Sequence, residues 1–206
     1  MKITKIEVFP VDSGFNPPRI WLFCAVRTDE GITGYSEFGN SNITRGLMGL
    51  VQDIGAPLIG KDPTSPEKHY VDMYRRHRAE PYGATGMAIA GIELALWDIA
   101  GKAAGVPVHK LMGGPHRTEQ RVYWSHLATY RPNNWKLLGA KPLRTMADVA
   151  RAAEECPKAG YNAFKTNIVW PGNPARGIGM GIVGTHDQVA TRDIRKQAVA
   201  QIKTMR

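Results

Sequence analysis

The sequence has few cysteines, no long apolar run and no apolar leader. Its 206 residues include two cysteines, Cys24 and Cys156, too few for a disulfide framework and typical of a cytoplasmic protein with free thiols. No apolar stretch reaches the ~18 residues that a membrane-spanning helix needs. The N-terminus alternates like a strand and lacks the apolar core of a signal peptide. We therefore expect a soluble, cytoplasmic protein without a membrane partner.

Acidic residues are scarce in the second half of the chain. Residues 1–118 hold 13 basic and 12 acidic side chains, whereas residues 119–206 hold 14 basic and 6 acidic, so most of the net charge of +9 lies there. Excess positive charge can indicate nucleic-acid binding. Here the basic residues are scattered, and Arg192, Arg195 and Lys196 are spaced as on a solvated helix face. We therefore expect no nucleic-acid partner.

The first 118 residues predict a domain of antiparallel strands and helices. Alternating apolar residues predict strands, and a turn at 29–31 joins two of them as a hairpin. Apolar residues at helical spacing follow, and Ser65 with Pro66 is typical of a helix start. The expected strands are 3–11, 21–28 and 32–37, and the expected helices are 46–56, 66–78 and 85–104.

The most distinctive element is the helix within residues 88–107, which is apolar on several faces. A surface helix would show one apolar stripe, so we expect protein layers on two sides of this one. Gly105 and Pro107 end it. Glu93 and Asp98 lie within it and face different directions, because five residues span more than one turn. This spacing favours structural roles over an acid–base pair.

From residue 119 the pattern changes to alternating strands and helices, which favours parallel strands with helical crossovers. We expect a strand at 121–126, a helix at 145–160 capped by Thr145, a strand at 161–168, a loop at 170–184 and a last helix capped by Thr185. The loop contains Gly179-Met-Gly-Ile-Val-Gly184, a match to the G-x-G-x-x-G dinucleotide motif. No second strand with a ribose-binding acid follows, so we interpret it as a loop.

Three motifs together resemble one known family. The most specific runs from Ala90 to Ala103, followed by Gly105, Pro107 and Leu111-Met-Gly-Gly114. The hairpin motifs 28–31 and 34–37 and the segment 160–167 follow the same family's order and spacing. Residues 1 to about 170 thus resemble the mandelate racemase and muconate lactonizing enzyme group of the enolase superfamily.

This resemblance implies an α+β capping domain, residues 1–118, followed by a TIM-type barrel from residue 119. A complete barrel takes about 250 residues, so residues 119–206 hold about two β/α units and the barrel is incomplete. The implied chemistry is Mg²⁺-dependent abstraction of the proton alpha to a carboxylate. In the family the metal ligands lie on the third to fifth strands, after Arg206, so no ligand is assigned here. We expect the N-terminal part of a longer enzyme, inactive by itself.

Lys165 and Asn167 are the candidate catalytic residues. Lys165 matches the first lysine of the family's Lys-x-Lys pair, whose charge faces the substrate carboxylate. Asn167 replaces the second lysine, and an amide cannot act as a general base. This Lys-x-Asn pattern is similar to acid-sugar dehydratases of the galactonate type, which implies a small sugar acid as substrate and Asn167 as a hydrogen-bonding residue.

Further candidates lie at the expected mouth of the barrel. His126 ends the first barrel strand and can titrate near neutral pH, and Trp170 begins the loop after Lys165. The other histidines, His69 among them, are interpreted as surface or loop residues. Two cap loops match the family's specificity loops and hold the remaining substrate-binding candidates, although a solvated loop is the alternative: Phe15, Asn16, Arg19, Asn40 and Arg45.

Two alternatives to a dehydratase remain open. A racemase or cycloisomerase of the same superfamily would have the same fold. A non-catalytic cap-domain module, associating with itself, belongs to a different class. The resemblance also implies that the full-length enzyme is a homo-oligomer.

Overall fold

The computed structural model describes residues 1–40, 43–178 and 190–206. The expected loop motif 179–184 and the expected cap Thr185 lie outside the described residues. Contacts divide the chain into two compact units. The first comprises Met1–Gly14 and Pro18–Thr118, and the second comprises Phe15–Pro17 and Glu119–Arg206.

A three-stranded antiparallel sheet forms one layer of the first unit, as the alternation predicts. The strands are β1 (Ile3–Asp12), β2 (Ile20–Thr28) and β3 (Thr33–Asn40), in the order β1-β2-β3. On β2, Cys24 and Val26 are fully buried, whereas the alternate residues Phe23 and Arg27 are exposed. One face of the sheet therefore carries the core and the other faces solvent.

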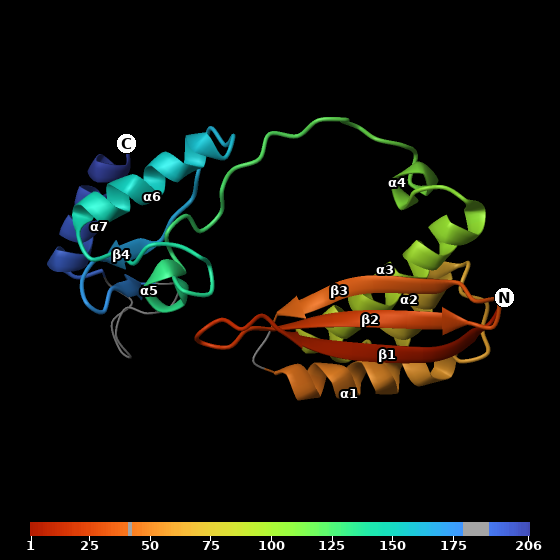
Figure 1. Cartoon of the computed structure of the whole chain (residues 1–206). Helices are drawn as coiled ribbons and strands as arrows, with labels where there is room; N and C mark the ends of the chain where they lie inside the picture. The colour runs from red at the N-terminus through yellow and green to blue at the C-terminus, as the bar shows by residue number, and fades with distance from the viewer. Residues whose placement is uncertain (41–42, 179–189) are drawn as a thin grey trace. The chain divides into compact units, whose positions relative to one another are not determined.

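Helices cover the buried face of this sheet (Figure 1). They are α1 (Thr44–Gly55), the 3-10 turn η1 (Ala56–Leu58), α2 (Pro66–Arg76) and α3 (Ala84–Ala104). The short helix α4 (Val108–Leu111) follows α3 and has no buried residue. The bounds of the first three long helices agree with the sequence expectation to within two residues. α3 packs against β3 so closely that a Cβ on Gly34 would lie 2.0 Å from the Ala95 carbonyl oxygen.

α3 is covered on one side within the first unit. Eight of its residues are buried, among them Ile92 and Leu96, whereas Leu94 on another face is 48% exposed. Its length and composition would also suit a membrane span, but half of that window is buried in protein, as in the core helix of a globular domain. Asp98 accepts hydrogen bonds from the Tyr35 N–H (2.8 Å) and the Lys102 ammonium (2.6 Å), which confirms a structural role.

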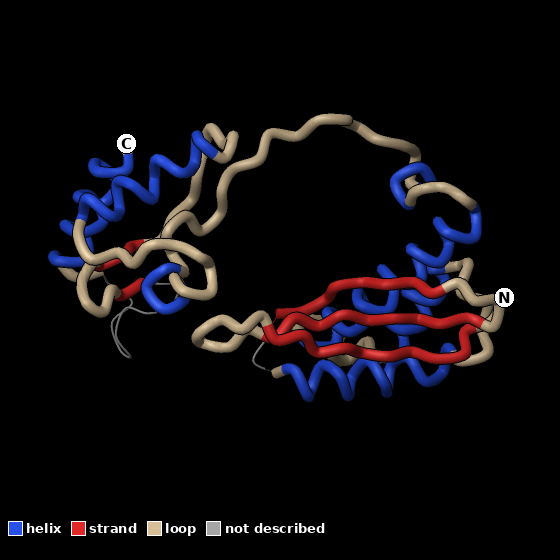
Figure 2. Tube along the Cα trace, viewed as in Figure 1, coloured by secondary structure: helices blue, strands red, loops and turns tan. Residues whose placement is uncertain are grey.

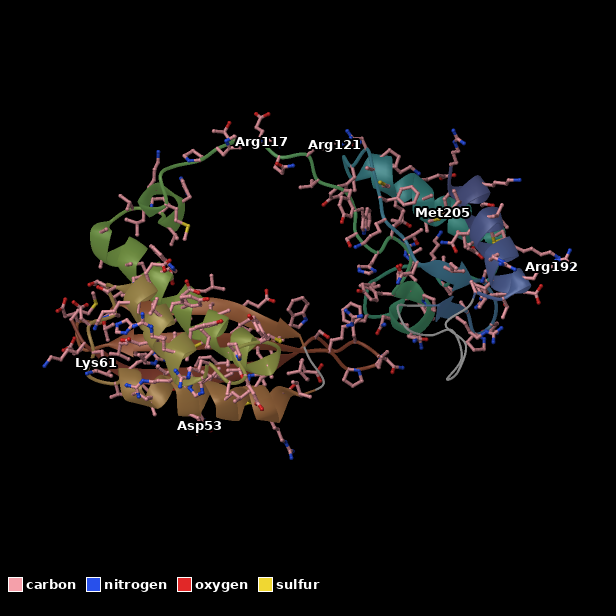
Figure 3. All side chains as sticks on the ribbon, turned by 180° about the vertical axis from the view of Figure 1, so that it is seen from behind. Asp53, Lys61, Arg117, Arg121, Arg192 and Met205 are labelled. Atoms are coloured by element: carbon pink, nitrogen blue, oxygen red, sulfur yellow. The ribbon has the colours of Figure 1, made fainter. Side chains whose placement is uncertain are left out.

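Residues 112–123, all of them described, form no helix or strand (Figure 2). Arg117 and Arg121 lie on this segment (Figure 3). The Arg121 guanidinium donates to the Asn162 carboxamide oxygen at 2.9 Å.

The second unit contains α5 (Arg131–Asn134), α6 (Met146–Lys158), β4 (Ile168–Trp170), β5 (Arg176–Ile178) and α7 (Arg192–Met205). α7 begins at Arg192 and is capped by Thr191, whose hydroxyl accepts from the Ile194 N–H. Figure 3 labels the two ends of α7, Arg192 and Met205. The cap at Thr145 is confirmed, because Thr145 and Asp148 form a reciprocal capping box.

The expected barrel strands 121–126 and 161–168 are much shorter than predicted. They meet in one parallel bridge, Trp124 with Phe164. The Trp124 N–H donates to the Ala163 carbonyl, and the Lys165 N–H donates to the Trp124 carbonyl, at 3.0 and 2.9 Å. The extended backbone then ends, because His126 has a φ of 58° and Ala128 a φ of 63°, which are left-handed conformations outside the β region.

Side chains replace part of the missing strand pairing. Gln201 of α7 is 1% exposed, and its carboxamide accepts from the Val169 N–H (2.7 Å) and donates to the Asn167 carbonyl (2.9 Å). The core around it joins α6, α7 and β4 through Val149, Val169 and Met205. The Val169 N–H and the Asn167 carbonyl are thus satisfied by a side chain of α7 rather than by a further strand.

Candidate functional site

The structure brings three of the predicted site residues together in the second unit. The Phe15 ring packs edge-on against Tyr130, with centroids 5.3 Å apart. The His126 ring lies 5.1 Å from the same Tyr130 ring. Tyr130 therefore links Phe15 to His126, although 111 residues separate those two in sequence.

Asn16 is held in the same place through its main chain. The Asn16 N–H donates to the Asn134 carboxamide oxygen at 2.6 Å, and the Asn134 amide donates to the Asn16 carbonyl at 2.9 Å. Asn134 is 6% exposed, whereas Asn16 itself is exposed. Neither Tyr130 nor Asn134 is among the residues predicted from the sequence, because no helix is expected between 126 and 145. A proline at the second position of the sequence Arg-Pro-Asn-Asn was the available signal for a helix start.

A cavity of about 590 Å³ opens beside His126. It lies between the segment around Trp124 and Tyr130, the loop 138–142 and one face of α6. Its wall is strongly charged: the Arg131 guanidinium is buried and forms a two-pronged ion pair with Glu155, with one N–O distance of 2.9 Å. A paired, buried guanidinium is a fixed part of the wall and stabilises the packing of α5 on α6.

Lys165 and Asn167 lie outside that cavity. Trp124 and Phe164 pack on the core that includes α6, so the alternate residues Tyr123 and Lys165 project from the other face of the bridged segments. Lys165 is exposed, with its ammonium 5.8 Å from the centre of the Tyr123 ring. The Asn167 N–H donates to the Thr129 hydroxyl at 3.0 Å. Lys165 therefore does not line the cavity beside His126.

The remaining predicted residues lie on other segments. Trp170 ends β4, and its ring lies 5.9 Å from the Arg176 guanidinium. This corrects its assignment to the start of a loop. Arg19, Asn40 and Arg45 belong to the first unit. Arg45 is exposed in the first turn of α1, and Asn40 ends β3 with a side chain outside the described part of the structure.

The described residues contain no group of three or more His, Cys, Asp or Glu side chains that could hold a metal ion. They therefore do not fit a magnesium site. His69, expected at the surface, is 4% exposed, and its Nε2 lies 2.6 Å from the Asp62 carbonyl oxygen. The packing of α2 against α3 explains this burial.

The sequence matches the family described as mandelate racemase / muconate lactonizing enzyme, N-terminal domain, over residues 19–113. Among curated proteins, the D-galactonate dehydratase of Variovorax paradoxus (strain S110) is 36% identical over 167 residues. The match covers 81% of this chain and 38% of the relative. The chain therefore spans well under half the length of the curated relatives it matches.

Solved structures share the fold. One is of a proposed L-alanine-DL-glutamate epimerase from Burkholderia xenovorans strain LB400, with a TM-score of 0.89 at 28% identity over 100% of this chain and 52% of that chain. Another is of an enolase-superfamily member from Salmonella Typhimurium, with a TM-score of 0.81 at 27% identity over 100% and 51%. These likenesses confirm the predicted fold class, a capping domain with part of a barrel. Residues 19–113 belong to the mandelate racemase / muconate lactonizing enzyme N-terminal domain family of the enolase superfamily, and the chain is similar to galactonate-type dehydratases.

Proposed function

We propose that this chain forms the N-terminal part of a dehydratase that acts on a sugar acid. The first unit corresponds to the capping domain, 1–118, and the second to the first two β/α units of a barrel, 119–206. The reaction removes the proton alpha to the carboxylate and expels the neighbouring hydroxyl as water, which leaves a 2-oxo acid. The observation that carries the proposal is the similarity to D-galactonate dehydratases over four fifths of the chain.

The side chains of the second unit suit this substrate. The Lys165 ammonium is exposed beside Tyr123 and can bind a carboxylate. The Asn167 carboxamide can donate to and accept from substrate hydroxyls, but it cannot take the alpha proton. We assign Phe15, Asn16 and His126 to the wall of the substrate pocket, and Arg19, Asn40, Arg45 and Trp170 to its outer contacts.

In the full-length enzyme magnesium would supply Lewis-acid stabilisation of the negative charge that develops when the alpha proton is lost. One structure with the epimerase description contains magnesium and fumarate. The described residues of this chain offer no ligand set, so we assign no residue here to the metal. We further propose a cytoplasmic homo-oligomer without nucleic-acid or membrane partners.

An epimerase is the second candidate, and the likeness to the Burkholderia structure supports it. Both reactions begin with loss of the alpha proton, and the Lys165 charge would serve either. Asn167 favours the dehydratase. In a racemase a lysine at that position would act as the general base, and an asparagine carboxamide cannot take that role.

A chimera can test the proposal. Residues 1–206 would replace the corresponding segment of the Variovorax dehydratase, and formation of the 2-oxo acid from D-galactonate would be measured in magnesium buffer. We expect turnover, and we expect Lys165→Ala to lower it by about 10²-fold, because it removes a cation facing developing charge. Lys203→Ala, at an exposed position of α7, is the matched control and should leave turnover unchanged.

A folded chimera that exchanges the alpha proton for deuterium without losing water would support the epimerase instead. For the 206-residue chain alone we expect no turnover of D-galactonate and no specific magnesium binding by calorimetry. Turnover by this chain without added protein would contradict that expectation.

A further inference from the structure

Asn134 is one of the buried polar residues of the second unit. It is 6% exposed and lies on the four-residue helix α5. A buried carboxamide must have partners for both its oxygen and its nitrogen, or it costs free energy. Its two short hydrogen bonds, 2.6 and 2.9 Å, go to the N–H and the carbonyl of one residue, Asn16.

We propose that Asn134 is a positioning residue that fixes the main chain of Asn16 and so holds Phe15 against Tyr130. The ring of Tyr130 in turn contacts His126. The carboxamide offers one acceptor and one donor on a planar group, as a peptide does. It therefore pairs with Asn16 as a neighbouring strand would. Only asparagine and glutamine carry an amide group in the side chain, with a carbonyl acceptor and an N–H donor side by side. This accounts for the residue type at this position.

A role for Asn134 within α5 alone would predict a different set of hydrogen bonds. Its amide also donates to the Tyr130 carbonyl, four residues earlier, but at 3.3 Å this is the longest of its three bonds. A helix-terminating function would need only that bond. The two shorter bonds span 118 residues of sequence. The geometry thus points to the segment Phe15–Pro17 as the partner that Asn134 serves.

The consequence concerns specificity and rests on the proposed function. Because Asn134 binds only main-chain atoms, it fixes the path of Phe15–Pro17 without using the exposed side chain of Asn16. The residue at 16 can then change without loss of the path. The segment Phe15–Pro17 therefore keeps a fixed backbone, on which the side chain at position 16 can vary to contact different sugar acids.

Amide hydrogen exchange in the intact 206-residue protein tests whether Asn134 holds the main chain of Asn16 through these two hydrogen bonds. In the wild type we expect the Asn16 amide to be protected, because its N–H donates to a buried oxygen. Asn134→Ala should speed its exchange about tenfold, as expected for loss of such a bond, and should shift the ring resonances of Phe15 and His126. Asn133→Ala, on the exposed neighbouring residue, should change neither signal.

Asn134→Asp distinguishes the two hydrogen bonds between Asn134 and Asn16. Aspartate keeps the acceptor for the Asn16 N–H and loses the donor to the Asn16 carbonyl, so we expect protection between that of wild type and of Asn134→Ala. An unprotected Asn16 amide in the wild type would overturn the proposal, even if both variants failed to fold. Protection in Asn134→Ala within twofold of wild type would overturn it as well. Neither readout depends on turnover, so failure of the proposed dehydratase activity remains a separate result.

Discussion

Gly34 leaves no room for a side chain between β3 and α3. A Cβ there would lie 2.0 Å from the Ala95 carbonyl oxygen and 2.7 Å from Ile99 Cγ1. Gly34→Ala must push the sheet from the helix, so we expect the free energy of unfolding of the first unit to fall by about 2 kcal/mol. Urea unfolding followed by circular dichroism measures this. Gly49→Ala, inside α1 with nothing within 4 Å of the new Cβ, should instead stabilise by about 1 kcal/mol.

Cys24 makes the stability of the first unit depend on pH. Burial raises the pKa of its thiol to about 12, whereas an unfolded thiol titrates near 8.5. Its contribution is complete below pH 8.5 and is lost as the pH rises toward 12, because only the unfolded chain ionises in that range. We expect wild type to lose about 1.4 kcal/mol per pH unit more than Cys24→Ala above pH 9. Equal pH slopes of unfolding free energy for the two proteins would contradict this.

At the scale of elements, the sequence predicts the helices well because a helix is made of local hydrogen bonds. The bounds of α1, α2, α3 and α6 follow from periodicity and caps. The bounds predicted for the strands of the second unit are wrong, because a strand needs a hydrogen-bonded partner. Here the extended backbone ends at His126, which has a left-handed conformation. No local pattern indicates that Gln201, more than thirty residues later, supplies hydrogen bonds to the chain at 167–169.

The capping box of α6 offers a test at this scale. Asp148 accepts from the Thr145 N–H at 2.7 Å, and Thr145 accepts from the Asp148 N–H at 3.3 Å. Thr145→Ala removes one half of the box, so we expect the second unit to lose about 1 kcal/mol of unfolding free energy. Thr145→Ser keeps the hydroxyl and should stay close to wild type in thermal unfolding. A loss as large for serine as for alanine would show that the methyl group, not the cap, is responsible.

At the scale of the whole molecule, the sequence motifs predict the family and the two-part organisation, but only part of the candidate site. Lys165 and Asn167 come from a contiguous motif and could be named in advance. Tyr130 and Asn134 could not, because their partners Phe15 and Asn16 lie more than a hundred residues away. The structure also leaves Lys165 outside the cavity that His126 lines, which the sequence position of neither residue indicates.

The connecting segment 112–123 gives the last prediction. It has no helix or strand, and Arg117 and Arg121 on it are exposed, whereas residues 179–189 contain no lysine or arginine. A protease cleaves where backbone can leave its hydrogen bonds at low cost. We therefore expect brief trypsin treatment to cut first after Arg117 and Arg121, as mass spectrometry of the products would show. In the double variant Arg117→Gln/Arg121→Gln, trypsin should no longer cleave this segment early in the digestion. Early cleavage inside α3 or α6 would mean that the compact units open more easily than the segment joining them.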